Sequence, residues 1–295
     1  QADAAIGATL GGSSLRGFPQ TVLRDGFRRT PPPQIGNTAQ VEVIKGPLST
    51  LYGDASPGGL INYVSKRPST RPSGSLTLSG GDDGYFRSNL TASGPLAGRK
   101  LYYLVSADHY YRKGATRYTY GRQSDYFGTL LFKPWEGTSL SVTWETVRLI
   151  GARAATVPLQ VVGTRPSGTN PLNWTGGVSV GIDWRLARMG YSRFGPGERY
   201  ERRYDGLNVM LEHAYNSNWK QRLGYQGQWK KFNLIYRTNS NVSAETNRMA
   251  GVVPNKRLQD IDSPGALQTD LLGHFTTGSV KHALLLTADY AQEET

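Results

Sequence analysis

Residues 41–68 read VEVIKGPLSTLYGDASPGGLINYVSKRP, and this stretch predicts the structure of the first part of the chain. It contains two short apolar patterns rich in β-branched residues, Val41–Ile44 and Leu60–Val64. Two clusters of turn residues separate them, Gly46-Pro47 and Ser56-Pro57-Gly58-Gly59. Turn residues this dense between β-branched runs predict a compact β element with tight corners.

Two short motifs precede this stretch, Leu15-Arg16-Gly17-Phe18 and Leu23-Arg24-Asp25-Gly26. In this order the motifs resemble the plug domain of TonB-dependent outer-membrane receptors, and within that family the ferric-siderophore receptors of the ferrichrome type. The resemblance implies that residues 1–70 are the C-terminal part of a plug domain and that residues 71–295 are the N-terminal part of the barrel around it. It also implies uptake of a ferric siderophore through the outer membrane of a Gram-negative bacterium, energised through TonB.

From Gly74 onward the chain predicts a β meander whose strands are near ten residues long, as tilted membrane strands are. Alternation is clearest at 219–230, where Trp219, Leu223, Tyr225 and Trp229 share one face and mostly polar residues share the other. The expected fold class is all-β, a partial transmembrane antiparallel β-barrel of about nine strands with part of a lumenal plug. The expected strands are 74–81, 85–95, 100–112, 124–134, 138–148, 204–215, 219–238, 266–277 and 280–291.

The connections between these strands alternate in length. Short turns are expected at 96–99, 135–137, 216–218 and 278–279, and longer connections at 113–123, 149–203 and 239–265. Alternate connections of a meander lie at opposite ends, so all the long ones emerge on one side. That is the arrangement of outer-membrane barrels, which have short periplasmic turns and long extracellular loops.

Composition narrows the class of protein. The chain has no apolar run of about 18 residues, which excludes a transmembrane helix but not a barrel. Its 36 glycines, 17 tyrosines and 6 tryptophans, without cysteine, fit a barrel with glycine-rich turns and aromatic belts. The net charge of +12 has three readings: nucleic acid, anionic lipopolysaccharide, or attraction of an anionic iron chelate. Nucleic acid is disfavoured because the basic residues are scattered and no nucleic-acid motif is present.

The number of strands predicts a piece of a longer receptor. A plugged barrel needs about 22 strands, and nine would leave two open edges, which lipid does not tolerate. No segment matches the family's TonB-contacting box, and no terminal aromatic residue closes the chain. We therefore expect an internal fragment.

Residues expected to contact the substrate lie near the two upstream motifs and in the long connection 149–203. A proline-rich run follows Arg28 and Arg29 and would hold them on a stiff extended loop, where guanidinium groups suit chelate oxygens. The aromatic residues of 149–203, mixed with arginines, suit a flat anionic chelate. For the two arginines, solvated loop charges or contacts to the barrel wall are the alternatives; for the long connection, self-packing or contact with lipopolysaccharide. The candidates are Phe18, Gln20, Phe27, Arg28, Arg29, Trp174, Trp184 and Tyr191.

A second expectation concerns ion pairs between plug and barrel, because the family pairs basic plug residues with glutamates of the inner wall. Arg16, Glu42 and Lys45 sit at the motif positions, and the resemblance implies that charged residues there take part in the ion pairing between plug and barrel. Glu212, next to apolar Leu211, is a candidate partner in the barrel, since a carboxylate facing a plugged lumen needs a counter-charge. A carboxylate facing lumenal water is the alternative.

An enzyme is not expected. The four histidines fall inside predicted strands without metal-ligand spacing, and neither a nucleophile elbow nor a phosphate loop occurs. Iron would arrive inside its chelator, so no cofactor and no direct metal ligands are expected. Two other interpretations stay open: a passive porin or adhesin-like barrel, and a soluble carbohydrate-binding β-sandwich.

Overall fold

The structure is a computed structural model whose described residues are almost entirely β-strand. No helix in the described part of the chain is long and apolar enough to cross a membrane. The described residues are 14–15, 18–19, 21–29, 37–46, 57–98, 100–114, 118–152, 159–162, 178–182, 199–238, 242–243 and 253–292.

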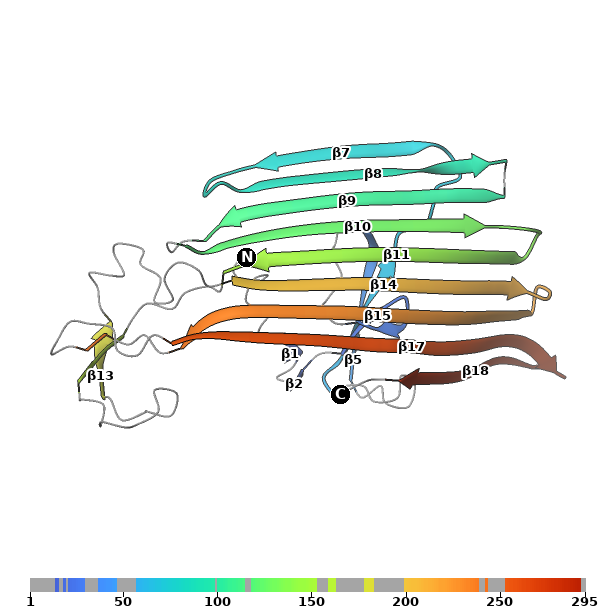
Figure 1. Ribbon diagram of the computed structural model, residues 1–295. Coiled ribbons are helices and arrows are strands. Elements are labelled where there is room, and N and C mark those ends of the chain that lie inside the picture. The colour runs from blue at the N-terminus through green and yellow to red at the C-terminus, as the bar shows by residue number, and fades with distance from the viewer. Residues whose placement is uncertain are drawn as a thin grey trace.

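A nine-stranded antiparallel sheet dominates the molecule (Figure 1), as the sequence predicts. Its order is β18-β17-β15-β14-β11-β10-β9-β8-β7, so neighbours in the sheet are successive strands of the meander. The strands are β7 (Ser73–Gly80), β8 (Phe86–Ala97), β9 (Leu101–Lys113), β10 (Tyr120–Phe132), β11 (Thr138–Gly151), β14 (Arg199–Ala214), β15 (Trp219–Thr238), β17 (Val253–Thr277) and β18 (Val280–Gln292).

The four short turns predicted from residue 96 onward lie together at one end of this sheet. The predicted longer connections leave from the other end, where the short connection between β7 and β8 also lies (Figure 1). Three strands begin clearly earlier than the sequence predicts: β10 at Tyr120, β14 at Arg199 and β17 at Val253. The two longest strands, β15 with 20 residues and β17 with 25, are about 65–80 Å long at ~3.3 Å per residue. They extend well beyond an apolar band that is about 25 Å tall. Their outer parts need no apolar face, so the alternation used for prediction is absent there.

The two faces of the sheet differ in character. Leu76, Leu130 and Leu223 are about half exposed or more on the outward face, which fits a surface covered by lipid. The opposite face carries buried polar residues such as Gln226 and Gln228. The alternation predicted for 219–230 is therefore confirmed, and the polar side faces the lumen.

A separate four-stranded sheet lies against the polar face, and Figure 1 shows these blue elements behind the wall strands. Its order is β4-β3-β6-β5, with β3 parallel to β6 and the other pairs antiparallel. This is the compact β element predicted from residues 41–68, and we call it the plug sheet. The boundary at residue 70 stays a prediction. The strands are β3 (Thr21–Arg24), β4 (Phe27–Arg28), β5 (Thr38–Lys45) and β6 (Gly59–Ser65).

Two smaller strand groups complete the described structure. Ahead of the plug sheet, β1 (Ser14–Leu15) pairs with β2 (Phe18–Pro19). At the end of the long connections, β12 (Leu159–Val162), β13 (Val178–Ile182) and β16 (Val242–Ser243) form a three-stranded sheet. The connection 149–203 therefore contains strands of its own.

Candidate functional site

The turn between β3 and β4 positions the two arginines, Arg24 and Arg29, that form the centre of the candidate site. Asp25 and Gly26 form a two-residue hairpin turn with φ of 51° and 89°, the positive values that favour an Asp-Gly pair. Asp25 Oδ1 accepts a hydrogen bond from the backbone N–H of Ser65 at 2.8 Å, and Asp25 Oδ2 accepts a second one from the hydroxyl group of Ser65. The N–H of Gly26 donates to Asn62 Oδ1 at 3.2 Å. The motif is thus held against β6 within the plug sheet.

Arg24 precedes this turn and points from the plug sheet to the wall. Its side chain is 6% exposed, and Nη1 lies 3.3 Å from Glu145 Oε1 of β11. Nε donates to Ser65 Oγ at 2.9 Å, and the guanidinium lies 5.0 Å from the centre of the Phe127 ring. Burial lowers the pKa of Arg24 and the charge of Glu145 opposes that change, so the guanidinium stays protonated.

Arg29 approaches the same carboxylate from the end of β4. Its side chain is fully buried, with Nη2 3.0 Å from Glu145 Oε2 and the guanidinium 4.5 Å from the centre of the Tyr204 ring. Asn37 Nδ2 donates to Glu145 Oε1 at 3.1 Å. Two cations from the plug sheet therefore share one glutamate of the wall. Removing one partner of a buried pair costs about 3–5 kcal/mol, because the remaining charge has no counter-charge.

The predicted ion-pairing residues take different places. Glu212 pairs with Arg67, at 3.3 Å, but this pair is exposed and Arg67 lies after the plug sheet. Glu42 accepts hydrogen bonds from Gln40 and Asn62 within the plug sheet. Lys45 is exposed, and Arg16 lies outside the described residues.

The sequence analysis missed Glu145, although the signal was available. Glu145 directly follows an apolar residue, Trp144, in a predicted strand, just as Glu212 directly follows Leu211. Both carboxylates point to the lumen, and only the height of the plug sheet against the wall decides which of them it meets.

The predicted substrate residues are also separated by the structure. Phe18 is 49% exposed and Arg28 is exposed. Phe27 is buried against Gly224, where an added Cβ would lie 2.6 Å from its ring. The expectation that Phe27 and Arg29 stand on an accessible loop is wrong, because β4 turns both side chains into the wall. Gln20, Trp174, Trp184 and Tyr191 lie outside the described residues.

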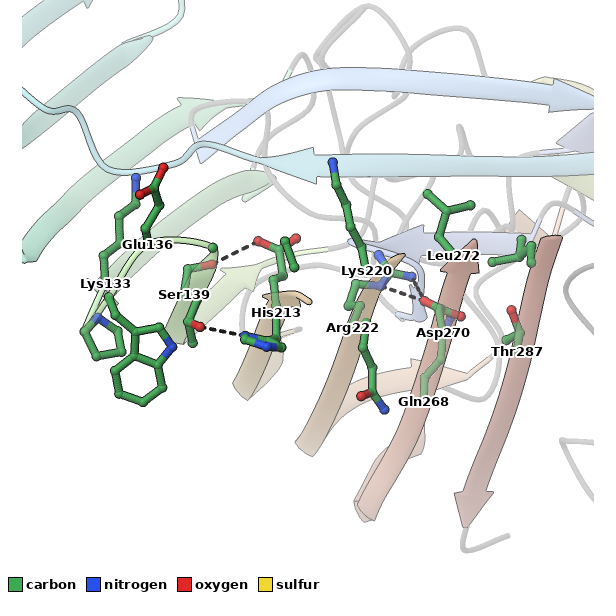
Figure 2. A pocket seen from close by; sticks show the side chains of 18 of the residues that line it. Lys133, Glu136, Ser139, His213, Lys220, Arg222, Gln268, Asp270, Leu272 and Thr287 are labelled. Carbon is green, nitrogen blue, oxygen red and sulfur yellow. Dashed lines mark hydrogen bonds and ion pairs between the residues drawn. The ribbon is translucent and has the colours of Figure 1, made fainter. Parts of the chain in front are cut away.

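Within the part of the chain that the structure describes, three cavities lie along the lumenal face. One of about 120 Å³ borders Phe27 and Arg28, and one of about 330 Å³ lies under the Asp25-Gly26 turn. The third, of about 1230 Å³, opens at the short-turn end of the wall. Figure 2 shows in it the ion pair of Arg222 with Asp270, whose Nε–Oδ2 distance is 2.7 Å.

The metal-pseudopaline receptor CntO of Pseudomonas aeruginosa is 27% identical over 265 residues, which cover 88% of this chain and 34% of that receptor. The ferrioxamine B receptor of Salmonella typhimurium is 26% identical over 254 residues, covering 85% and 33%. The crystal structure of the ferripyoverdine receptor of the P. aeruginosa outer membrane aligns with a TM-score of 0.75 and 20% identity, covering 92% and 35%. No family model matches the chain.

The chain thus spans about a third of the length of these relatives. Its homologues over most of that span are TonB-dependent siderophore receptors, as the motifs predict. The fold is the plug and barrel wall found in such receptors. The relatives are receptors rather than enzymes, and they place the chain in the outer membrane of a Gram-negative bacterium.

Proposed function

We propose that this chain supplies part of the plug and part of the wall of a receptor that imports ferric siderophores. The observation that carries the proposal is the shared ion pairing of Arg24 and Arg29 with Glu145, on the lumenal face of a wall whose other face is apolar. A small sheet fastened inside the wall blocks free diffusion. Because its backbone faces a polar lumen, it can be rearranged without exposing unpaired backbone groups to lipid.

The ligand would bind at the end of the wall from which the long connections leave. Phe18 and Arg28 are the exposed candidates among the described residues, and Gln20, Trp174, Trp184 and Tyr191 stay candidates from the sequence. Iron would remain inside its chelator, so the protein would need neither a cofactor nor a catalytic residue. Names of the relatives support this ligand class: one receives metal-pseudopaline and another ferrioxamine B.

Two partners belong to the same proposal. TonB would transmit the energy of the inner-membrane proton gradient to the plug. Lipopolysaccharide would contact the outward face, where Arg122 and Arg148 lie exposed toward the long-connection end of β10 and β11. Phosphate groups attract such cations. Nucleic acid has no part in the proposal.

The two alternatives predict different surfaces. A passive porin needs an open lumen, whereas here a plug sheet is fastened across it by buried ion pairs. A soluble sandwich would cover its apolar residues, whereas Leu76, Leu78 and Tyr290 are each more than 60% exposed on the wall.

Growth on single iron sources tests the proposal. Cells with and without the intact receptor gene would be offered ferrioxamine B, ferrichrome, ferripyoverdine or the metal-pseudopaline complex as sole iron source. We expect growth on at least one chelate to depend on the gene and on TonB. Growth independent of the gene on all four, together with sugar permeation through the receptor in swelling liposomes, would replace the proposal with a porin.

A further inference from the structure

A group of basic residues lies on the lumenal face of the wall, toward the long-connection end of β14, β15 and β17 (Figure 1). At its centre, Arg202 of β14 is the cross-strand partner of Phe232 of β15, and Phe232 is the partner of Gln259 of β17. Lys230 lies two residues from Phe232 along β15, on the side nearer the plug sheet. Arg257 lies two residues from Gln259 along β17, on the side nearer the long connections. We call these five residues the lumenal basic patch.

The direction of the Arg202 side chain follows from its neighbour on β14. Tyr204 faces the lumen, because its ring centre lies 4.5 Å from the Arg29 guanidinium of the plug sheet. Side chains two positions apart share one face of a strand, so Arg202 faces the lumen as well. Its guanidinium lies 4.9 Å from the centre of the Phe232 ring. The ring orients the guanidinium, and among the described residues no carboxylate pairs with it.

The outward face of the same strands is also charged, but there the charges are balanced. The row of outward residues next to Arg202 and Phe232 runs across β11, β14 and β15. Three cations of this row pair with carboxylates at 2.6 to 3.4 Å: Arg148 with Glu201, Arg203 with Asp205 and Lys231 with Asp260. The alternation of the strands therefore places paired charges outside and the basic patch inside.

The lumenal side lacks carboxylates that could balance the patch. From Tyr204 to the long-connection end, the described lumenal side chains of β14, β15 and β17 include no aspartate and no glutamate. Arg257 donates a hydrogen bond to Gln259 Oε1 at 3.4 Å, and no described carboxylate pairs with it. Unbalanced cations on one wall of a lumen attract anions and raise their local concentration.

Arg28 brings a further cation from the plug sheet to the same side of the lumen. Its backbone carbonyl accepts a hydrogen bond from Gln228 Nε2 at 2.8 Å. Gln228 lies two residues from Lys230 on the lumenal face of β15, and the Arg28 side chain is exposed. The plug sheet and the wall therefore both contribute basic residues to one region.

We propose that the lumenal basic patch binds free carboxylate groups of the ferric chelate, so that the receptor selects anionic chelates over neutral or cationic ones. This inference rests on the proposed function and names its substrate class. Arg202 offers a planar fork of donors that matches a carboxylate. Because Phe232 already orients this fork, less side-chain freedom is lost when the ligand binds. Lys230 and Arg257 flank the fork and favour a ligand with more than one negative group.

Two matched substitutions in the full-length receptor test the site. Arg202→Gln removes the central charge of the patch, whereas Arg203→Gln removes the neighbouring charge on the outward face, where it pairs with Asp205. The probes are the chelates of the growth panel above together with ferric citrate, which is an anion, each loaded with radioactive iron. Ferrioxamine B, which carries a free ammonium group, and ferrichrome, which has no net charge, serve as the comparison. Binding to cells is measured at equal amounts of receptor in the outer membrane.

The expected result has three parts. An anionic chelate of the panel should bind the unmodified receptor about tenfold or more tighter than ferrioxamine B does. Arg202→Gln should weaken binding of that anionic chelate by about tenfold, which corresponds to the loss of one charge-assisted hydrogen bond, whereas Arg203→Gln should change it by less than about twofold. Raising the ionic strength to about 1 M, where the Debye length is roughly 3 Å, should weaken binding to the unmodified receptor more than binding to Arg202→Gln.

The outcomes separate the two proposals. A receptor that prefers ferrioxamine B or ferrichrome, or whose Arg202→Gln and Arg203→Gln variants bind an anionic chelate alike, overturns the inference and leaves the proposed function intact. Equal salt dependence of the unmodified receptor and Arg202→Gln also overturns it, because the loss would then not be electrostatic. A receptor that binds no chelate of the panel disproves the proposed function and this inference with it.

Discussion

Replacing Glu145 by Gln removes the carboxylate shared by Arg24 and Arg29 while keeping the shape of the side chain. In the structure this carboxylate lies 3.3 Å from one guanidinium and 3.0 Å from the other, and all three side chains are 6% exposed or less. At an effective dielectric constant of about 20, each contact corresponds to roughly 5 kcal/mol of attraction before desolvation is subtracted. The variant would leave two buried cations facing a neutral amide.

The net cost follows from what remains buried. Truncating one partner of a buried ion pair destabilises by about 3–5 kcal/mol, which corresponds to a rise of roughly 10²- to 10⁴-fold in the population of receptors whose plug sheet has left the wall. In the unmodified receptor Asn37 donates a hydrogen bond to Glu145 Oε1, and the amide oxygen of the glutamine can still accept that hydrogen bond. We therefore expect the lower half of this range.

Thiol labelling of the full-length receptor measures that population. Thr38 is 8% exposed beside Asn37, so a Thr38→Cys thiol should react with maleimide only after local opening. When opening is fast relative to the reaction, the labelling rate is proportional to the open fraction. In this background, Glu145→Gln should raise the rate by about two powers of ten or more.

The matched control is Glu212→Gln, which removes the same charge from the wall at the exposed pair with Arg67. Those side chains are 38% and 76% exposed, and exposed pairs contribute about 1 kcal/mol or less. We expect a rise in labelling below about fivefold. If Glu145→Gln accelerates labelling no more than Glu212→Gln, the buried pair does not hold the plug, and the reasoning is refuted.

Three further predictions use the same receptor. Gly224→Ala forces Phe27 to move, because the new Cβ would lie 2.6 Å from its ring. The rate of maleimide labelling at Thr38→Cys should rise by about tenfold; an unchanged rate would show that the ring can shift without loosening the plug sheet. Asp25→Ala leaves two donors of β6 without their acceptor and should lower plug stability in urea by about 1–3 kcal/mol; an unchanged midpoint would contradict this. Leu223→Arg places a charge on the outward face, where the leucine is 45% exposed, and should destabilise the liposome-inserted receptor by about 2–4 kcal/mol; the lumenal Thr287→Arg should cost far less, and equal costs would reverse our assignment of the faces.

The wall could be predicted well from the sequence because apolar and polar residues alternate within its individual strands. In β15, for example, an even number of positions separates Trp219, Leu223 and Trp229, so all three lie on one face of the strand. Lipid on that side requires them to be apolar. The prediction failed where this requirement ends. Residues 253–265 continue β17 beyond the expected start, and pairing with β15 alone, rather than an apolar face, keeps them extended.

The site was harder to predict because its parts are far apart in the chain. Arg24 and Glu145 are separated by 121 residues, and nothing local distinguishes Glu145 from Glu212. Arg29 precedes a proline-rich run typical of an exposed loop, yet β4 turns its side chain to the wall. A buried position for an arginine becomes favourable only when a carboxylate is already there.

Short-range patterns were therefore sufficient for the strand order, the sorting of short and long connections, and the presence of a plug motif, because hairpin pairing and lipid contact act between near neighbours in the chain. The height and rotation of the plug sheet against the wall depended on the assembled molecule. Those two quantities select the glutamate that binds the arginines, since they arise from the fit between two surfaces that meet only after each has folded.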